Sequence, residues 1–164
     1  MHLIPDERLA NPVDMVEHIA STHDWMFERS AEDEITINVA GSWADYHVSI
    51  TWMHDIEALH IASAFDLRVP EARRAEVRRL LTLVNEQIWV GHFDMWSKDS
   101  LILYRHALLL AGGTEASDRQ IEALLGVATE TCERYYSAFQ FVVWAGKTAR
   151  EAFDAVIFDT AGRA

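Results

Sequence analysis

Cysteine, proline and glycine are all scarce in this chain: of its 164 residues, one is cysteine, three are proline and seven are glycine. The single cysteine, Cys132, excludes an intrachain disulfide, and its place in an apolar helical pattern predicts a buried thiol. No run approaches about 18 consecutive apolar residues, so no membrane-spanning helix is expected. The first residues lack the basic and apolar regions of a signal peptide. We therefore expect a cytoplasmic protein with no membrane partner.

Basic residues are also scarce, with 14 against 26 acidic residues and a formal net charge of -12. Such a charge opposes binding to nucleic acid unless a local basic patch overrides it, so we expect no nucleic-acid partner. Five arginines lie within residues 67–79, together with Glu71 and Glu76. They form either a solvated helix face with Arg–Glu pairs or a docking patch for an acidic partner. In the second interpretation, Arg74 and Arg78 are candidate contacts.

Recognisable catalytic motifs are missing: the sequence contains no HExxH, no CxxC, no glycine-rich phosphate loop and no GxSxG. We therefore expect no catalytic residue, metal or cofactor. The eight histidines keep a small histidine-using enzyme or a metal-binding protein as the alternative. In that alternative, His92 and Asp94 share one face of a short strand, with His106 on the partner strand, as an acid–base group would require.

A second histidine arrangement is predicted on two strands that are expected to be neighbours. Alternation places His47 and His60 on the same polar face, where Asp45 or Asp55 could complete a metal site. The other interpretation is a pair of exposed sheet histidines without a ligand. The spacing of residues does not decide between them.

The hydrophobic periodicity predicts one α+β domain over residues 1–164, with fraying ends at 1–10 and 159–164. Short connections favour an antiparallel sheet of about five to six strands with helices packed on one face. The element order is α-β-β-β-β-α-β-β-α, with a short closing helix. The expected strands span 25–27, 34–39, 46–52, 59–65, 91–95 and 100–109, and the expected helices 12–23, 70–91, 117–146 and 148–157.

Two surfaces are candidates for binding a protein partner. One is the polar, small-residue face of the sheet, represented by His47, Thr51 and His60. The other is the apolar segment 139–144, which belongs either to the core or to an interface, with Phe141 and Trp144 as the candidate contacts. Pairing of an extended segment with a sheet edge is one possible binding mode.

Two stretches also carry a family resemblance. Residues 83–113, LVNEQIWVGHFDMWSKDSLILYRHALLLAGG, hold a helix ending at Asn85, the pair Gly91 and Phe93, a polar turn and the dipeptide Tyr104–Arg105. Residues 133–157, ERYYSAFQFVVWAGKTAREAFDAVI, add an aromatic cluster and a Trp-x-Gly sequence. From about residue 10 to 158 the chain resembles the YbjN family of bacterial proteins.

The resemblance implies a fold like that of type III secretion chaperones. It also implies a candidate sensory transduction regulator with no assigned enzymatic activity. Relatives in fold bind extended segments of partner proteins, commonly as homodimers, although fold alone does not establish a function. The leading expectation is therefore a non-enzymatic regulatory or chaperone-like protein-binding module that forms a homodimer and also binds another protein.

Overall fold

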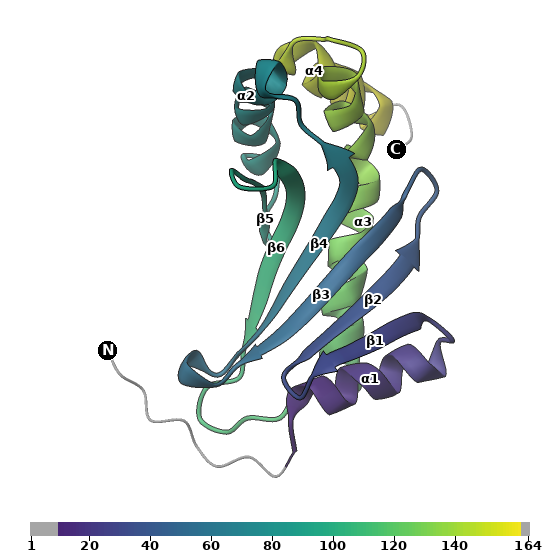
Figure 1. The fold of residues 1–164 in the computed structure, drawn as a ribbon, viewed down its shortest axis with the longest axis vertical. Helices are drawn as coiled ribbons and strands as arrows, with labels where there is room; N and C mark the ends of the chain where they lie inside the picture. The colour runs from purple at the N-terminus through teal and green to yellow at the C-terminus, as the bar shows by residue number, and fades with distance from the viewer. Residues whose placement is uncertain (1–9, 162–164) are drawn as a thin grey trace.

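The computed structural model describes residues 10–161, within which the chain forms four α-helices, two short 3-10 helices and six strands (Figure 1). The helices are α1 (Pro12–Thr22), η1 (His54–Ile56), η2 (Glu71–Arg73), α2 (Arg74–Asn85), α3 (Asp118–Val143) and α4 (Ala149–Ala161). The strands are β1 (Met26–Ala31), β2 (Glu34–Ala40), β3 (Asp45–Met53), β4 (Ala58–Arg68), β5 (His92–Trp96) and β6 (Leu101–Leu109). No helix in this described part is long and apolar enough to cross a membrane.

Side-chain caps mark the starts of α1 and α3. Asn11 accepts a hydrogen bond from the Val13 amide at 3.0 Å, and Pro12 occupies the first turn of α1. Ser117 and Gln120 form a reciprocal capping box at α3. These side chains satisfy amides that have no partner within the helix, and this fixes where each helix begins.

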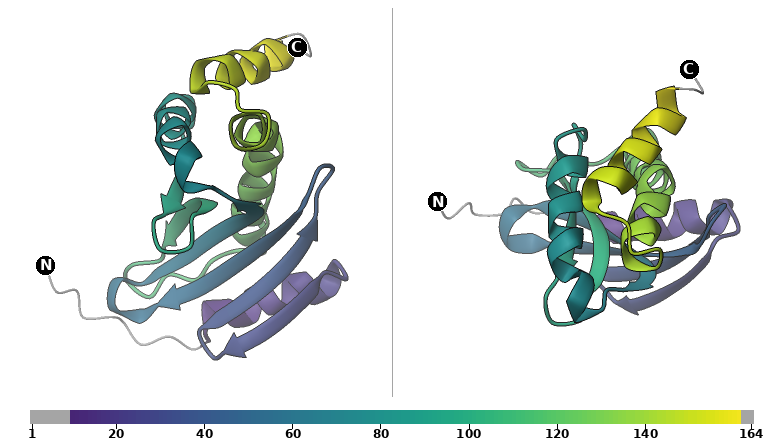
Figure 2. Two further views of the ribbon diagram at one scale, coloured as in Figure 1. Left: turned by 45° about the horizontal axis from the view of Figure 1, so that its top comes forward. Right: turned by 90° about the horizontal axis from the view of Figure 1, so that it is seen from above.

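The six strands form one antiparallel sheet in the order β1-β2-β3-β4-β6-β5. The α+β class and the antiparallel sheet are confirmed. The hairpin of β5 and β6 joins through β6, which pairs with β4, so β5 and β1 are the two edges. Figure 2 shows the helices gathered on one side of the sheet. The apolar second strand of the hairpin is therefore central in the sheet but covered on one face only.

The core lies between the sheet and α3 and is built around a cluster of aromatic rings. Phe65 and Phe93 are its centre, with centroids 5.8 Å apart, and each contacts Phe139 of α3. The cluster comprises Tyr46, Phe65, Phe93, Tyr104, Tyr135, Tyr136 and Phe139. Aromatic pairs in such tilted and edge-to-face arrangements add attraction beyond the area they bury.

Cys132 lies in this core, fully buried, with its Sγ 3.4 Å from the Ser63 Oγ. Burial raises the pKa of the thiol to about 12, so the group stays protonated and unreactive at neutral pH. The prediction of a buried thiol is confirmed.

Two side chains of the arginine-rich stretch connect helices to one another. The Arg73 guanidinium donates to the Val142 carbonyl at 2.9 Å and to the Lys147 carbonyl at 2.7 Å, beyond the last turn of α3. The Glu76 carboxylate accepts from the Ala149 amide at 2.9 Å, and this hydrogen bond, helped by the Arg79 guanidinium, lowers the pKa of Glu76. A cation at a helix C-terminus and an anion at a helix N-terminus are both favourable. The stretch is thus only partly a solvated face.

Two helix ends expected from the periodicity are wrong, whereas the helix end at Asn85 expected from the family resemblance is confirmed. Helix α2 ends at Asn85 and does not run to Gly91, because the Asn85 side chain accepts from the Phe93 amide at 2.8 Å and donates to the Phe93 carbonyl at 3.0 Å. Helix α4 continues to Ala161, so residues 159–161, which were expected to fray, are helical. Residues 1–9 and 162–164, the rest of the expected frayed ends, lie outside the described residues.

Candidate partner-binding surface

Within residues 10–161 the helices lie on one side of the sheet and leave its other face, here called the open face, without a covering element (Figure 2). The register pairs Thr51 with His60 across β3 and β4, and His47 with Ala64. These residues alternate with the buried side chains of both strands. The prediction that His47, Thr51 and His60 share the face opposite the core is confirmed. Their role in binding a partner stays a prediction.

At the centre of the open face, β3 and β4 carry small side chains, and the formal charges of β3, β4 and β6 nearly cancel. Ser49, Ala62 and Arg105 lie side by side on β3, β4 and β6. The charged residues that these three strands place on the open face are Asp45, Asp66, Arg68 and Arg105, because they alternate with core residues. Two carboxylates and two guanidiniums give these strands no net formal charge there. Large apolar side chains are exposed toward its margins: Met26 by 74%, Met53 by 44%, Trp96 by 46% and Leu109 by 69%. A face with this composition suits contact with another protein.

A short polar network crosses the face from β4 to β5. The Arg105 Nε donates to the His60 Nε2 at 3.3 Å, and the Arg105 Nη1 lies 3.6 Å from an oxygen of Asp94. Burial lowers the pKa of His60, and the Arg105 guanidinium lowers it further. His60 is therefore a neutral hydrogen-bond acceptor at pH 7. The sequence predicted only an exposed polar residue at this position.

The network predicts that the protein loses stability as the pH falls through the range of histidine titration. Because the folded state lowers the pKa of His60 below its ordinary 6.5, the unfolded state binds the proton more tightly. The contribution of neutral His60 is thus fully present above about pH 7 and decreases below 6.5. Urea unfolding at pH 7.5 and 5.5 should show a smaller loss for His60→Gln than for the wild type. His47→Gln, which changes an exposed histidine on the same face, should keep the wild-type loss.

The structure does not bring the expected histidine groups together within residues 10–161. The His47 ring bonds the Asn38 side chain at 2.8 Å, while Asp45 and Asp55 are exposed. His106 pairs with the core residue Ile61 and so lies on the helix-covered face. Within the described residues, no group of three or more His, Cys, Asp or Glu side chains is placed to hold a metal ion.

The proposed acid–base group on the hairpin is also divided by the sheet. His92 and Asp94 share the open face, as predicted, because their register partners Arg105 and Leu103 lie there. His106 lies on the other face, where burial lowers its pKa. One sheet layer therefore separates His106 from His92 and Asp94.

The two edges of the sheet differ in how open they are. At β5 the Asn85 side chain occupies the amide and carbonyl of Phe93, and the Asp94 carboxylate accepts from the Met95 amide at 2.9 Å. At β1 five of the six residues are exposed, including Met26. Side chains that occupy outward backbone groups prevent another strand from pairing there. Strand addition, if it occurs, is favoured at β1.

The segment 139–144 contains both core and surface. Phe139, Val142 and Val143 are buried, whereas Phe141 is 39% and Trp144 65% exposed. The core interpretation is therefore confirmed for these three buried residues, and the interface interpretation stays a prediction for the two exposed ones. Phe141 and Trp144 remain candidate contacts.

The two arginines proposed as contacts lie in different environments. Arg78 is exposed on α2, as a docking residue should be. Arg74 is only partly exposed and donates to the hydroxyl of Ser100, beyond the β5–β6 turn.

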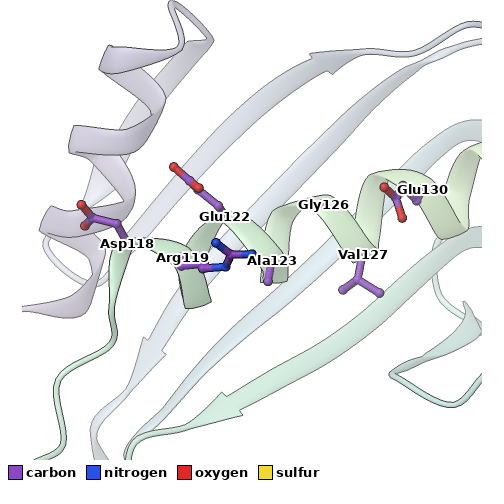
Figure 3. Close-up of a pocket in the computed structure, with 7 residues that line it drawn as sticks. All are labelled: Asp118, Arg119, Glu122, Ala123, Gly126, Val127 and Glu130. Atoms are coloured by element: carbon purple, nitrogen blue, oxygen red, sulfur yellow. The ribbon is translucent and has the colours of Figure 1, made fainter.

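The sequence also left one surface unnoticed, the outer side of α3. Figure 3 shows seven side-chain positions along one side of the helix, and they line a shallow hollow of about 790 Å³. The residues are Asp118, Arg119, Glu122, Ala123, Gly126, Val127 and Glu130. A β-carbon at Gly126 would meet nothing within 4 Å. The sequence did offer one signal of this surface. Gly126 interrupts an otherwise continuous helical pattern at a position where core packing does not require a glycine.

Comparisons with known proteins agree on one family. The model of the YbjN family, described as a putative bacterial sensory transduction regulator, matches residues 12–141. The crystal structure of YbjN from E. coli, titled a putative transcription regulator, is similar in fold, with a TM-score of 0.54 at 10% identity over 81% of this chain and 90% of that one. No curated protein matches the chain.

Proposed function

The chain belongs to the YbjN family, and from that premise we propose that it is a regulatory protein that acts by binding other proteins and not by catalysis. The family description, a putative bacterial sensory transduction regulator, supports a regulatory role. The observation that carries the binding mode is the open face: no helix covers it, and three of its adjacent strands, β3, β4 and β6, carry two carboxylates and two guanidiniums on a chain of net charge -12. Overall repulsion opposes self-association of an acidic protein, and a neutral face is where that repulsion is weakest.

A second copy of the chain is the first partner that we propose for this face. Symmetric homodimers bring the same patch of both subunits together, so the patch must tolerate its own charge pattern. The balanced carboxylates and guanidiniums of β3, β4 and β6 meet that condition. Phe141 and Trp144, at the opposite end of α3 from its cap, then remain available for a different protein. The net charge disfavours nucleic acid as that partner.

A matched pair of alanine substitutions tests the homodimer. Ala62→Glu places a charge at the centre of the open face, next to Arg105, where the unpaired monomer can accommodate it. Ala123→Glu makes the same change on the exposed side of α3. Light scattering on a sizing column over a dilution series should give twice 18.7 kDa for the wild type and for Ala123→Glu. Ala62→Glu should dissociate at a concentration about tenfold higher or more, because a like-charge pair would be buried at the interface.

Two outcomes would contradict the assignment of the face. A monomer at every concentration would remove the second copy as its partner. A dimer that survives Ala62→Glu but dissociates with Trp144→Ala would place the interface at the end of α3. Far-UV circular dichroism and the melting temperature of each variant confirm that the comparison is between folded proteins.

A further inference from the structure

Three basic residues that form no ion pair with another described residue line one cavity. It has a volume of about 510 Å³ and lies where β4 runs into η2 and α2, against the β5–β6 turn. Its lining consists of Arg68, Val69, Pro70, Arg74, Lys98, Asp99 and Ser100. Three cations and one carboxylate therefore surround a space of the size that small-molecule sites have.

None of the three cations forms an ion pair with another described residue. The ion pairs of residues 10–161 use other basic side chains, such as Arg29, Arg79 and Arg105. Asp99 is the only acidic residue of the lining, so the cavity keeps a formal excess of two positive charges. On a chain of net charge -12, a local positive field of this kind is the exception.

The position of Arg74 is fixed without its charge being neutralised. Its Nη2 donates to the Ser100 hydroxyl, and its Nε is buried without a hydrogen-bond partner. Ser100 is itself held in place, because its amide donates to the Trp96 carbonyl at 2.8 Å and its carbonyl accepts from the Val69 amide at 3.0 Å. A neutral hydroxyl orients the guanidinium, but it leaves the charge to be balanced by something else.

We propose that this cavity binds the phosphate group of a small phosphorylated molecule. Guanidinium groups bind phosphate through paired hydrogen bonds, and a lysine adds a point charge. A phosphate dianion balances the excess of two charges, whereas a single carboxylate would leave one uncompensated. Val69 and Pro70 provide the only apolar part of the lining, which leaves room for a polar ligand and not for a lipid chain.

Calorimetric titration with inorganic pyrophosphate at low, constant ionic strength tests the proposal. Arg68→Gln and Lys98→Gln should each weaken the wild-type affinity about tenfold, since each removes one charged contact. Arg119→Gln removes the same charge from the exposed start of α3, outside the cavity, and should change the affinity by less than about twofold. Asp99→Asn should act in the opposite direction and tighten binding, because it removes the only carboxylate of the lining.

Parallel titrations with adenosine diphosphate and with inorganic phosphate distinguish a phosphorylated metabolite from the free anion, and either one supports the site. Absence of heat with all three probes up to about 10 mM would overturn it, as would an equal loss in Arg119→Gln and Arg68→Gln. Tighter binding of a short polyglutamate peptide than of pyrophosphate would reassign the cavity to an acidic protein segment. The melting temperature of each variant without ligand controls for damage to the fold.

Discussion

Gly91→Ala is expected to lower the free energy of unfolding by about 4 kcal/mol, which is a large part of the stability of an ordinary domain. Gly91 has a φ of +71°, in the left-handed region, where side chains other than glycine are strained. A β-carbon there would also overlap the Tyr104 phenol and lie 2.6 Å from the Arg105 carbonyl oxygen. Tyr104 cannot move aside easily, because it is fully buried and its hydroxyl donates to the Val90 carbonyl at 2.6 Å.

Gly146→Ala is the matched control, measured in the same urea titration. Its φ of +67° is nearly the same, but a β-carbon there would meet nothing within 4 Å. It should therefore show only the backbone strain, about 1 kcal/mol. Equal losses in both variants would mean that the surroundings of Gly91 adjust to the added methyl group and that overlap is not the cause. A variant of Gly91 that is recovered only as insoluble protein would agree with the expectation, and refolding from urea would then measure it.

The sequence predicted best what neighbouring residues determine among themselves. Alternation in β3 and β4 identified which side chains face the helices, because a strand has a strict two-residue period. The capping box at Ser117 marked the start of α3, since a polar side chain near helix amides acts locally. The parity of His47 and His60, and hence the open face, follows from the same local rule.

What the sequence did not predict depends on contacts between residues far apart in the chain. Nothing in residues 91–109 alone shows that β6 pairs with β4 and leaves β5 at the edge. Arg73 and Glu76 read as members of a charged helix face, but they cap α3 and α4. Glu57 lies in the turn after η1, and its buried carboxylate accepts from the amides of Gly112 and Gly113, both at 3.1 Å. Buried polar groups are explained by such partners, which only the fold supplies.

The candidate sites divide in the same way. The open face could be predicted because every second residue of a strand points to the same side of the sheet. The basic cavity could not, because Arg68, Arg74 and Lys98 come from three elements whose meeting point is set by the β4–β6 pairing. The histidine sites were inferred from shared faces and short separations in sequence. The group expected on the hairpin is not assembled, because β6 turns His106 toward the helices while His92 faces the open side.

Phe139→Ala is expected to destabilise the protein by about 3–5 kcal/mol, the usual range for removing a fully buried phenyl ring. The ring has no exposed surface, and its centroid lies 5.2 Å from that of Phe93 and 5.7 Å from that of Phe65. Alanine would leave a cavity between the sheet and α3 that the surrounding rings can fill only in part. Chemical denaturation followed by tryptophan fluorescence measures the loss, and the melting temperature should fall with it.

Phe141→Ala, two positions further along α3, should cost about 1 kcal/mol or less, since the side chain is 39% exposed. Helix phase explains the difference, because Cys132, Tyr135, Phe139 and Val142 recur at three- and four-residue steps and Phe141 does not fall on that stripe. The run of apolar residues from 139 to 144 concealed the phase, although the periodicity was present in the sequence. Equal destabilisation by both variants would mean that Phe141 belongs to the core. A stable Phe141→Ala variant keeps this residue available as a probe of the partner surface, because any loss of binding would then arise at the contact and not from unfolding.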